Sequence, residues 1–342
     1  MQDKVFVLIL GYNSLKDLNE CITSLLNQDY KNYEICFADN NSNDGSVEYI
    51  KENFSTVRTF QFKKNNGYAG GNNILIRKAF KAGADFCLVL NPDTKADKNL
   101  ITNLVITYEK EIKTNKIGLV QPVVMIYDMP EKINSAGNVI HYLGFGYCGG
   151  YMSEEIPKED KNIISVSGTT MLISKQYYKD VGLFDEDFFM YNEDQDYSWR
   201  GFLQGYKHYL SVSTKVWHKY SFVKNQKKMY FSEKNRLIMI LKNYSKKTLL
   251  KLIPILILNE SLILIYSLFD GWFFLKIKSY FLIIYNWKEI RKKRKIIQLS
   301  RLINDKDYLQ MFTSKLSFSE INNLGIRYLV NPLYYVYQKI IL

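Results

Sequence analysis

The stretch "LVLNPDT", residues 88–94, stops a run of aliphatic residues abruptly on Asn91, Pro92 and Asp93. Proline cannot donate a hydrogen bond to a strand ladder, and it favours an extended conformation in the residue before it. We therefore expect a buried strand that ends here and leaves the carboxylate of Asp93 at the edge of a sheet. Such a carboxylate suits Mg²⁺ or Mn²⁺, which take most of their other ligands from water and substrate phosphates. The alternative is that Asp93 only caps the helix that follows.

Strand-like and helix-like periodicity alternate from the start of the chain to about residue 125, which is the pattern of parallel βαβ units. In such sheets, ligands bind beyond the carboxyl ends of the strands, so we expect the site in the loops there. The expected strands cover residues 4–10, 33–39, 57–62 and 85–90, and the expected helices cover residues 15–28, 46–54 and 72–83.

The loops after the second and third strands carry polar residues and glycines. Asp39 lies at the tip of the second strand, and Asp44 falls in a tight turn, which can also be its whole role. The third strand leads into "NNGYAGGNN", residues 65–73, whose glycines would let the backbone pass close to a ligand. The spacing there is G-x-x-G-G and not the G-x-G-x-x-G of dinucleotide-binding proteins, so the sequence disfavours a nicotinamide enzyme.

A second pattern follows between residues 163 and 221. We expect strands over residues 163–174 and 208–221, with an acidic loop that enters a helix over residues 190–206 between them. Glu193 and Asp194 stand at the start of that helix, where a carboxylate can act as a general base if it reaches a substrate hydroxyl. The alternative is a solvated first turn that the helix dipole stabilises.

Composition and charge limit the class of protein. The 342 residues are 47% hydrophobic and carry a net charge of +12, which indicates a globular protein with a polyanionic neighbour. That neighbour could be nucleic acid, an anionic membrane surface or a phosphate-bearing substrate. The four cysteines form no CxxC pair, and the first residues lack the pattern of a signal peptide. We therefore expect a protein of the reducing cytoplasm.

The last third of the chain is apolar and basic. Residues 249–287 are long enough for a membrane span, but we expect Pro254, Asn259 and Glu260 to interrupt it. We expect instead a pair of helices that lie on the membrane or pack against the rest of the protein. The basic residues 288–298 would attract anionic lipids. The alternative is a buried helical hairpin followed by a solvated charge run.

Seven strings in order give the chain a recognisable pattern: "VLILGYNS", "FADNNSNDGS", "NNGYAGGNN", "LVLNPDT", "SGTTMLISK", "GLFDEDFFMYNEDQDYSWR" and "VWHKYS". Over residues 4 to about 221 the chain resembles the inverting family 2 glycosyltransferases, most closely their rhamnosyltransferase-like and galactofuranosyltransferase-like branch. The resemblance implies a GT-A (Rossmann-like) catalytic domain over residues 1–225, with a mixed, mostly parallel sheet flanked by helices. Residues 226–342 would then form a helical, membrane-associating region.

The resemblance also implies roles for individual residues. Asn91 and Asp93 occupy the position of the family's DxD motif, with asparagine in place of the first acid, and His218 would complete the metal shell with Asp93. Asp194 would be the catalytic base, with Glu193 as the fallback. The implied donor-binding set is Tyr12, Asn13, Asp39, Asn41, Asp44, Gly67, Gly70, Asn73, Asn91 and Gly168.

The implied activity is inverting transfer of a rhamnose-like or other hexose from a UDP- or dTDP-sugar to a hydroxyl of a glycan or polyprenyl-linked glycan. It would need Mg²⁺ or Mn²⁺ and would serve cell-surface polysaccharide assembly at the cytoplasmic face of the membrane, without nucleic acid as a partner. Two alternatives stay open. One is a degenerate GT-A fold that serves as a basic membrane or nucleic-acid scaffold. The other is a nucleotidyltransferase, which would carry a Gly-rich basic loop after the first strand, where "LGYNSLKD" stands.

Overall fold

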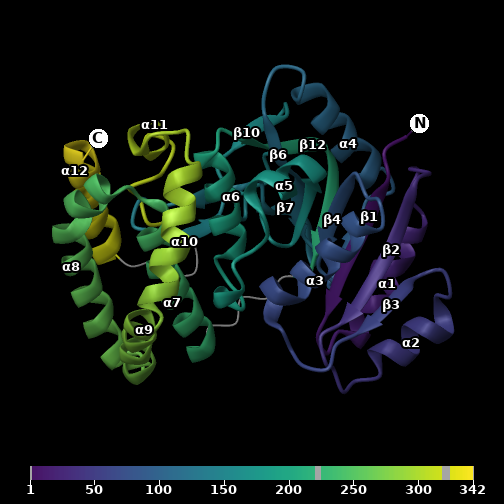
Figure 1. Cartoon of the computed structure of the whole chain (residues 1–342), viewed down its shortest axis with the longest axis horizontal. Coiled ribbons are helices and arrows are strands. Elements are labelled where there is room, and N and C mark those ends of the chain that lie inside the picture. Colours follow the sequence, from purple (N-terminus) through teal and green to yellow (C-terminus); the bar gives the residue numbers. More distant parts are fainter. Residues whose placement is uncertain (1, 220–224, 318–323, 342) are drawn as a thin grey trace. The chain divides into compact units, whose positions relative to one another are not determined.

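The computed structural model describes residues 2–219, 225–317 and 324–341, and the chain divides into two compact units (Figure 1). Unit 1 comprises Met1–Asn138, Cys148–Gly201 and Tyr206–Ser221. Unit 2 comprises Val139–Tyr147, Phe202–Gly205 and Phe222–Leu342. Each unit is described by itself below.

Unit 1 is built on a mixed sheet, which has ten strands among the described residues. Its order is β10-β12-β6-β11-β4-β1-β2-β3, and β5 pairs with β12 and β7 with β6. The strands are β1 Val5–Gly11, β2 Tyr33–Asp39, β3 Arg58–Gln61, β4 Phe86–Leu90, β5 Thr94–Ala96, β6 Ile117–Ile126, β7 Met129–Ser135, β10 Lys161–Ile163, β11 Thr170–Ser174 and β12 Lys207–His218. Strands β1 to β4 are parallel, whereas β11 runs antiparallel between β4 and β6. A small separate sheet joins β8 Asn138–Ile140 to β9 Gly146–Cys148.

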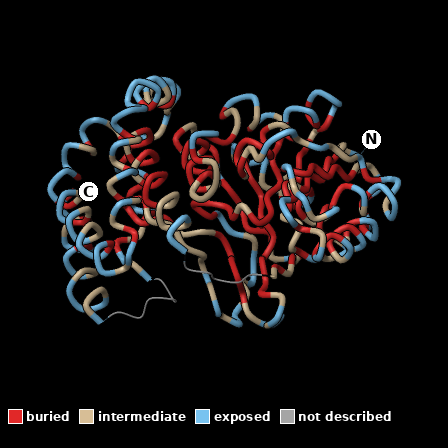
Figure 2. The backbone as a smooth tube through the Cα atoms, turned by 90° about the horizontal axis from the view of Figure 1, so that it is seen from below, coloured by how far each residue is buried: buried red, intermediate tan, exposed pale blue. Residues whose placement is uncertain are grey.

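Helices cover both faces of the sheet of unit 1, so its central strands are buried on both sides (Figure 2). Alternate residues of β1 enter two different cores: Val7 packs with α1 and α4, and Leu8 packs with α3, α5 and α6. The helices are α1 Leu15–Leu26, α2 Ser46–Asn53, α3 Gly67–Lys81, α4 Leu100–Glu111, α5 Lys175–Val181 and α6 Glu193–Leu203, with a 3₁₀ turn, η1, at Glu186–Phe188. This arrangement confirms the expected GT-A type of sheet. Cys36 and Cys87 lie in its core as small buried hydrophobes.

Two expected elements of unit 1 are different in the structure. Helix α3 begins at Gly67 and not at residue 72, so Gly70 and Gly71 lie inside a helix. A Cβ on Gly71 would come within 2.6 Å of Leu10, which shows that this glycine permits close packing of α3 on β1. The expected strand over residues 163–174 is two strands, β10 and β11. The residues between them bond to side chains: the Ser167 amide donates to Gln121 Oε1 at 2.6 Å.

Unit 2 is helical. Its helices are α7 Gln226–Asn243, α8 Lys246–Phe269, α9 Phe273–Tyr285, α10 Trp287–Ser300, α11 Asp305–Leu309, a π-helix η2 Ile326–Val330 and α12 Asn331–Ile341. Among the described residues, α8 alone is long and apolar enough to cross a membrane by length and composition. Helix α8 is continuous through Pro254, Asn259 and Glu260, so these residues interrupt the apolar sequence without breaking the helix. The charge of Glu260 is tolerated there because Arg236 and Lys276 pair with it.

Candidate active site

The loops after β1 and β2 are bonded into one rim at the carboxyl ends of the strands. The amide of Asn13 donates to Ser42 Oγ at 2.9 Å, and its side-chain oxygen accepts from the Asn43 amide at 3.2 Å. Asn13 and Asn41 both have positive φ angles, which asparagine tolerates better than most residues. Tyr12 is exposed on the same loop. The rim therefore presents polar groups around the tip of β2.

Asp39 is the buried residue at that tip. It is fully enclosed at the end of β2, and its Oδ2 accepts a hydrogen bond from the Ser42 amide at 3.0 Å. Its Oδ1 has no hydrogen-bond partner among the described residues. A buried acceptor without a partner is costly, so its retention indicates that a ligand donor completes it.

Asp44 is held by the protein itself. Its carboxylate accepts from the Leu15 amide at 2.9 Å and from the Ser46 amide and hydroxyl at 3.1 and 2.6 Å. Burial alone would raise the pKa of this carboxyl, but the hydrogen bonds from Ser46 and Leu15 outweigh burial and lower the pKa below its usual value. Asp44 thus fixes the loop that follows Asp39.

Asp93 and His218, the two predicted metal ligands, lie next to each other. Strand β5 pairs with β12 so that Thr94 stands opposite His218, and Asp93 Oδ2 comes 3.4 Å from His218 Nε2. The other ring nitrogen, Nδ1, lies 3.2 Å from Asn134 Oδ1 on β7. A hydrogen bond from Nδ1 to that oxygen leaves the lone pair of Nε2 directed at Asp93.

The donor set at this place fits a divalent cation in part. Asp93 Oδ1 is buried and has no hydrogen-bond partner among the described residues, so an acceptor oxygen stands ready beside an imidazole nitrogen. Within the described ranges, no cluster of three or more His, Cys, Asp or Glu side chains has metal-site geometry. The protein therefore offers two ligands, and a cation here would need the oxygens of a phosphate-bearing substrate and water for the rest of its shell.

Three hydrogen bonds anchor the carboxyl group of Asp194 at the start of α6. Its Oδ2 accepts from the Gly168 amide at 2.8 Å and from Asn138 Nδ2 at 3.3 Å, and its Oδ1 accepts from the Gln195 amide at 2.8 Å. Burial raises the pKa of this carboxyl, and the backbone hydrogen bonds lower it only in part, so the net direction is upward. A half-buried carboxylate with a raised pKa is a stronger proton acceptor than one in water.

Glu193, the neighbouring acid, is in a different state. Its side chain is 6% exposed, and its Oε2 has no hydrogen-bond partner among the described residues. Burial, followed by repulsion from Asp194, raises the pKa of Glu193 well above its usual value. More hydrogen bonds support a charge on Asp194 than on Glu193, so Asp194 is the better candidate for the charged member of this pair.

The loop before these acids is strained. Phe189, Tyr191 and Asn192 all have positive φ angles, which is uncommon for residues other than glycine. The carbonyl of Phe189 accepts from the Ala69 amide at 3.2 Å, and a Cβ on Gly67 would come within 2.4 Å of that carbonyl. Gly67 is therefore required for the loop to sit on the start of α3.

The acidic loop and the end of β4, which leads to Asp93, are linked through residues 168 and 169. The Thr169 carbonyl accepts from the Asn91 amide at 2.9 Å, and the amide of Gly168 holds Asp194. Tyr68 OH donates to the Gly168 carbonyl. Asp194, the candidate base, and the end of β4 therefore lie at the same edge of the sheet. Strand β4 ends at Leu90, three residues before Asp93.

Two members of the expected donor-binding set have roles inside the protein. The amide of Asn73 is fully buried; it donates to the Phe184 carbonyl and to Glu186 at 3.0 Å each, and it accepts from the Phe184 amide at 3.1 Å. Gly70 lies in the first turns of α3. Asn73 thus positions the segment that leads to the acidic loop.

Three site residues have no signal in the sequence. Asn134 contacts His218, Asn138 contacts Asp194, and Lys219 pairs with Asp17 of α1 at 3.0 Å while its amide donates to the Asp93 carbonyl at 2.9 Å. Their partners are distant in sequence, so no local pattern could have placed them there.

Comparison with known proteins agrees with this geometry. The family model described as "Glycosyl transferase family 2" matches residues 6–182, more than half of the chain. A low-salt glycan biosynthesis hexosyltransferase of Haloferax volcanii is 24% identical over 207 residues, which cover 58% of this chain and 62% of the relative. An N-acetylglucosaminyl-diphospho-decaprenol L-rhamnosyltransferase of Mycobacterium tuberculosis is 25% identical over 213 residues, covering 57% of this chain and 69% of the relative. The alignment with the first of these thus spans less than two thirds of that relative's length.

Solved structures support the same fold. The structure of GalNAc-T7 with UDP, GalNAc and Mn²⁺ matches 71% of this chain and 48% of that one, with a TM-score of 0.57 and 16% identity. That of S. aureus TarS matches 71% of this chain and 40% of that one, with a TM-score of 0.50 and 16% identity. At such identities the likeness establishes the fold, and the family-model match establishes the family. The chain belongs to glycosyltransferase family 2.

Proposed function

We propose that this chain is a metal-dependent, inverting hexosyltransferase that uses a UDP- or dTDP-sugar. It transfers a rhamnose-like or other hexose to a hydroxyl of a glycan or polyprenyl-linked glycan in cell-envelope polysaccharide biosynthesis. The observation that carries the proposal is the pair of carboxylates at one sheet edge: Asp194 bonded to the amide of Gly168, and Asp93 beside His218.

The donor is held by the rim of β1 and β2 and by the end of β4. Asp39 Oδ1 accepts an N–H of the nucleobase, which both uracil and thymine present at the same ring position. Asp93 and His218 would hold a divalent cation, and a cation there supplies charge stabilisation for a departing diphosphate. Asn91 contributes no charge, so the protein side of that cation site has a single carboxylate.

Asp194 takes the proton from the acceptor hydroxyl. As the oxygen of that hydroxyl forms its bond to the anomeric carbon, the bond to the diphosphate breaks, and its electron pair leaves with the diphosphate. The attack comes from the face opposite the leaving group, so the configuration inverts without a covalent enzyme intermediate. Glu193 stays protonated and is not needed as a base.

The acceptor and the location rest on the relatives. The mycobacterial relative is named for a decaprenol-linked acceptor, and the archaeal relative for glycan biosynthesis. We extend this to an acceptor presented at the membrane and to a peripheral enzyme at its cytoplasmic face. The buried thiols of Cys36 and Cys87, which lie inside the core, are compatible with a reducing compartment.

The test has two stages. Sugar nucleotides are first screened for a thermal shift of the purified chain with and without Mn²⁺, since a ligand that binds only the folded state raises its stability. The best donor is then used with a polyprenyl-diphosphate-linked N-acetylglucosamine acceptor, and the anomeric configuration of the product is read by NMR. A retained configuration would refute the mechanism, and the lack of any donor-induced shift would favour a non-catalytic scaffold.

A further inference from the structure

Unit 2 exposes large apolar residues on α8 and α9, and the next helix, α10, exposes a row of cations that form no ion pair among the described residues. We propose that this surface docks on a bilayer of anionic phospholipids, with α10 on the headgroups, the α8–α9 turn in the acyl region and α8 lying along the membrane rather than through it. This proposal goes beyond glycosyl transfer, because it assigns specific residues to lipid contact and does not depend on the donor or the acceptor.

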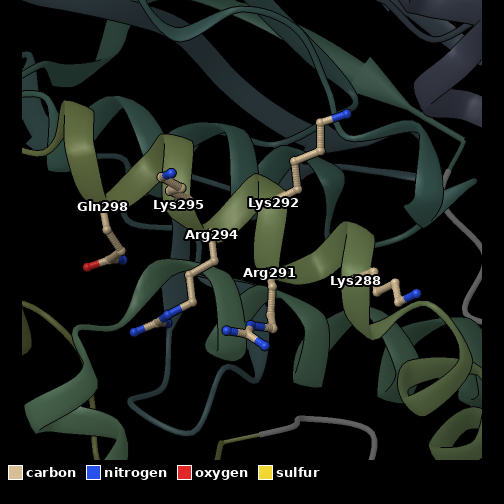
Figure 3. A pocket seen from close by; sticks show the side chains of 6 residues that line it. All are labelled: Lys288, Arg291, Lys292, Arg294, Lys295 and Gln298. Atoms are coloured by element: carbon tan, nitrogen blue, oxygen red, sulfur yellow. The ribbon is translucent and has the colours of Figure 1, made fainter.

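The cationic face belongs to α10. Lys288, Arg291, Lys292 and Lys295 are spaced by three, four and seven residues, so they share one side of the helix, and all four are exposed. The opposite side, with Ile290 and Ile297, is buried. Figure 3 shows these basic side chains fanning out from this single helix, where with Arg294 and Gln298 they line a groove.

The four outward cations have no structural task among the described residues. No hydrogen bond or ion pair joins them to the described part of the chain, in contrast to their neighbours in the groove. Arg294 donates to the Leu241 carbonyl, and Gln298 donates to the Lys242 and Asn243 carbonyls at 3.0 Å each, so these two side chains cap the end of α7. Two of the residues that line the groove therefore bond to α7, and the charges of the other four are not neutralised by the described part of the chain.

Helix α8 differs from a surface helix of a soluble protein in which of its side chains are exposed. The side that packs inward includes Leu252, Ile255 and Asn259, whereas the outward side consists of large apolar residues such as Ile257 and Leu268. Inside, Asn259 Oδ1 accepts from Tyr334 OH at 2.6 Å. The polar side chains of Thr248, Asn259 and Ser267 are therefore buried while large apolar residues are exposed, which is expected when the surroundings are lipid and not water.

The turn between α8 and α9 exposes its apolar residues most. Phe269 is 87% exposed and Phe274 is 84% exposed, and Gln226 Nε2 holds the turn by donating to the Gly271 carbonyl at 2.9 Å. At the other end of α9, directly before α10, Tyr285 is 85% exposed. Aromatic side chains at both ends of one helix suit the headgroup boundary of a membrane.

A transmembrane orientation of α8 is excluded by what is bonded to its middle. Glu260 pairs with Arg236 of α7 and, at 2.7 Å, with Lys276 of α9. A spanning α8 would therefore bring the whole ion cluster of Glu233, Arg236, Glu260 and Lys276 to the bilayer centre. An orientation along the membrane keeps these charges at the level of the headgroups.

A lipid bilayer explains both features of the surface, and the other occupants explain one each. A nucleic acid or polyphosphate would match the cations of α10 but leaves the exposed phenylalanines in water. A second copy of the chain could cover the apolar residues, but it would bring a second cationic face of the same sign. Anionic lipids offer negative charge and apolar depth side by side.

The test measures binding of the full chain to vesicles by flotation, with phosphatidylglycerol-containing and pure phosphatidylcholine vesicles. The first variant replaces four residues by glutamine: Lys288, Arg291, Lys292 and Lys295. A matched control loses the same net charge by replacing four exposed lysines of unit 1 that form no ion pair among the described residues: Lys31, Lys51, Lys81 and Lys113. We expect the α10 variant to bind anionic vesicles about a hundredfold more weakly and to lose most of its salt dependence. The control should lose less than about threefold.

A second variant, Phe269→Ser with Phe274→Ser, separates the apolar part. It should weaken binding to both kinds of vesicle, and high salt should then release what still binds. Circular dichroism checks that each variant is folded. The proposal is wrong if the control variant loses as much affinity for vesicles as the α10 variant, or if single-stranded DNA or polyphosphate competes fully with the vesicles. It is also wrong if the chain forms a dimer and binds no vesicles. Release of the wild-type chain by detergent but not by high salt would indicate a membrane span instead.

Discussion

Buried acids are bonded differently at the candidate site of unit 1 and in one ion cluster of unit 2. In unit 1 the buried acids Asp39 and Glu193 each keep one carboxyl oxygen without a hydrogen-bond partner among the described residues. In unit 2 the buried charges form a closed set: Glu233 pairs with Arg236 at 2.7 Å and with Lys276 at 2.6 Å, and Glu260 pairs with the same two cations.

The contrast separates groups that serve function from groups that serve packing. A buried polar atom without a partner costs stability, so it persists where a ligand or proton uses it. A closed ion cluster has nothing left to offer a ligand. Burial alone would raise the pKa of Glu260, but Arg236 and Lys276 outweigh burial and lower the pKa to about 2, so this carboxylate stays charged at any working pH. The following predictions test that division.

The largest effect is expected at Asp194. Asp194→Asn keeps the shape of the side chain and removes the proton acceptor. Turnover should fall by about a hundredfold to ten-thousandfold, because general-base assistance is typically worth that much. Donor affinity should stay nearly constant, since the base acts on the acceptor hydroxyl. Initial rates and calorimetric donor titration measure the two quantities.

Glu193→Gln is the matched variant for that experiment. If Glu193 is already protonated in the folded protein, the amide replaces a neutral group and turnover should fall far less. The reverse ranking would make Glu193 the base, and full activity in both variants would remove the acidic loop from catalysis.

The next largest effect is expected in the ion cluster. Arg236→Met leaves Glu233 and Glu260 with a single cation and should destabilise the chain by about 3–5 kcal/mol, because an uncompensated buried charge is costly. Urea unfolding of unit 2, followed by a probe such as Trp272, measures this change. Adding Glu233→Gln to Arg236→Met should restore part of the loss. No recovery in the double variant would mean that packing of the arginine stem, and not charge balance, is what the cluster provides.

A smaller effect is expected at the metal-binding position. Asp93→Asn removes the charge that faces His218 while the backbone bond from Lys219 to residue 93 remains. Donor affinity in Mn²⁺ should fall at least about tenfold, whereas donor affinity without metal should change little. Glu52→Gln removes an exposed charge of unit 1 and serves as the control. An Asp93→Asn protein that binds donor normally in Mn²⁺ would show that the carboxylate is not a ligand.

Much of unit 1 could be predicted because its signals are local. Strands β1, β2 and β4 are continuous apolar runs that end on polar residues, and a parallel sheet covered on both faces requires that pattern. The start of α3 was missed because glycines suggest a loop, whereas here they let the helix approach Leu10 and Phe189. Local propensity cannot reveal a contact made by another part of the chain.

The candidate site also combines features that depend on local sequence with features that depend on contacts between distant parts of the chain. The position of Asp93 is a local consequence of where a strand ends, whereas His218 was placed beside it by the resemblance to the family. That Asn134 orients the imidazole, or that Gly168 holds Asp194, depends on the register of β7 and β11 against their neighbours. In unit 2, Glu260 reads as an interruption because its partners lie on two other helices.

The smallest effect concerns stability and pH. Because the pKa of Glu193 is raised in the folded state above its ordinary 4.5, the folded chain holds this proton more tightly than the unfolded chain does. The contribution of Glu193 to stability is therefore fully present below about pH 4.5 and is lost as pH rises through the folded value. Glu193→Gln cannot lose a proton at this position. Near pH 8 its free energy of unfolding should therefore exceed that of the wild type by an amount on the order of 1 kcal/mol, and it should unfold at a higher temperature.

The two proteins should differ less in melting temperature at pH 4 than at pH 8, and thermal scans at a series of pH values measure that difference directly. Asp180→Asn is a useful contrast, because a hydrogen bond from Tyr206 lowers the pKa of Asp180, so its contribution is present above about pH 3.8 and is lost as pH falls further. The two variants should therefore diverge from the wild type in opposite directions as pH rises. If Glu193→Gln gained nothing at pH 8, the buried carboxyl would already be ionised there, and the assignment of separate protonation states to Glu193 and Asp194 would fail.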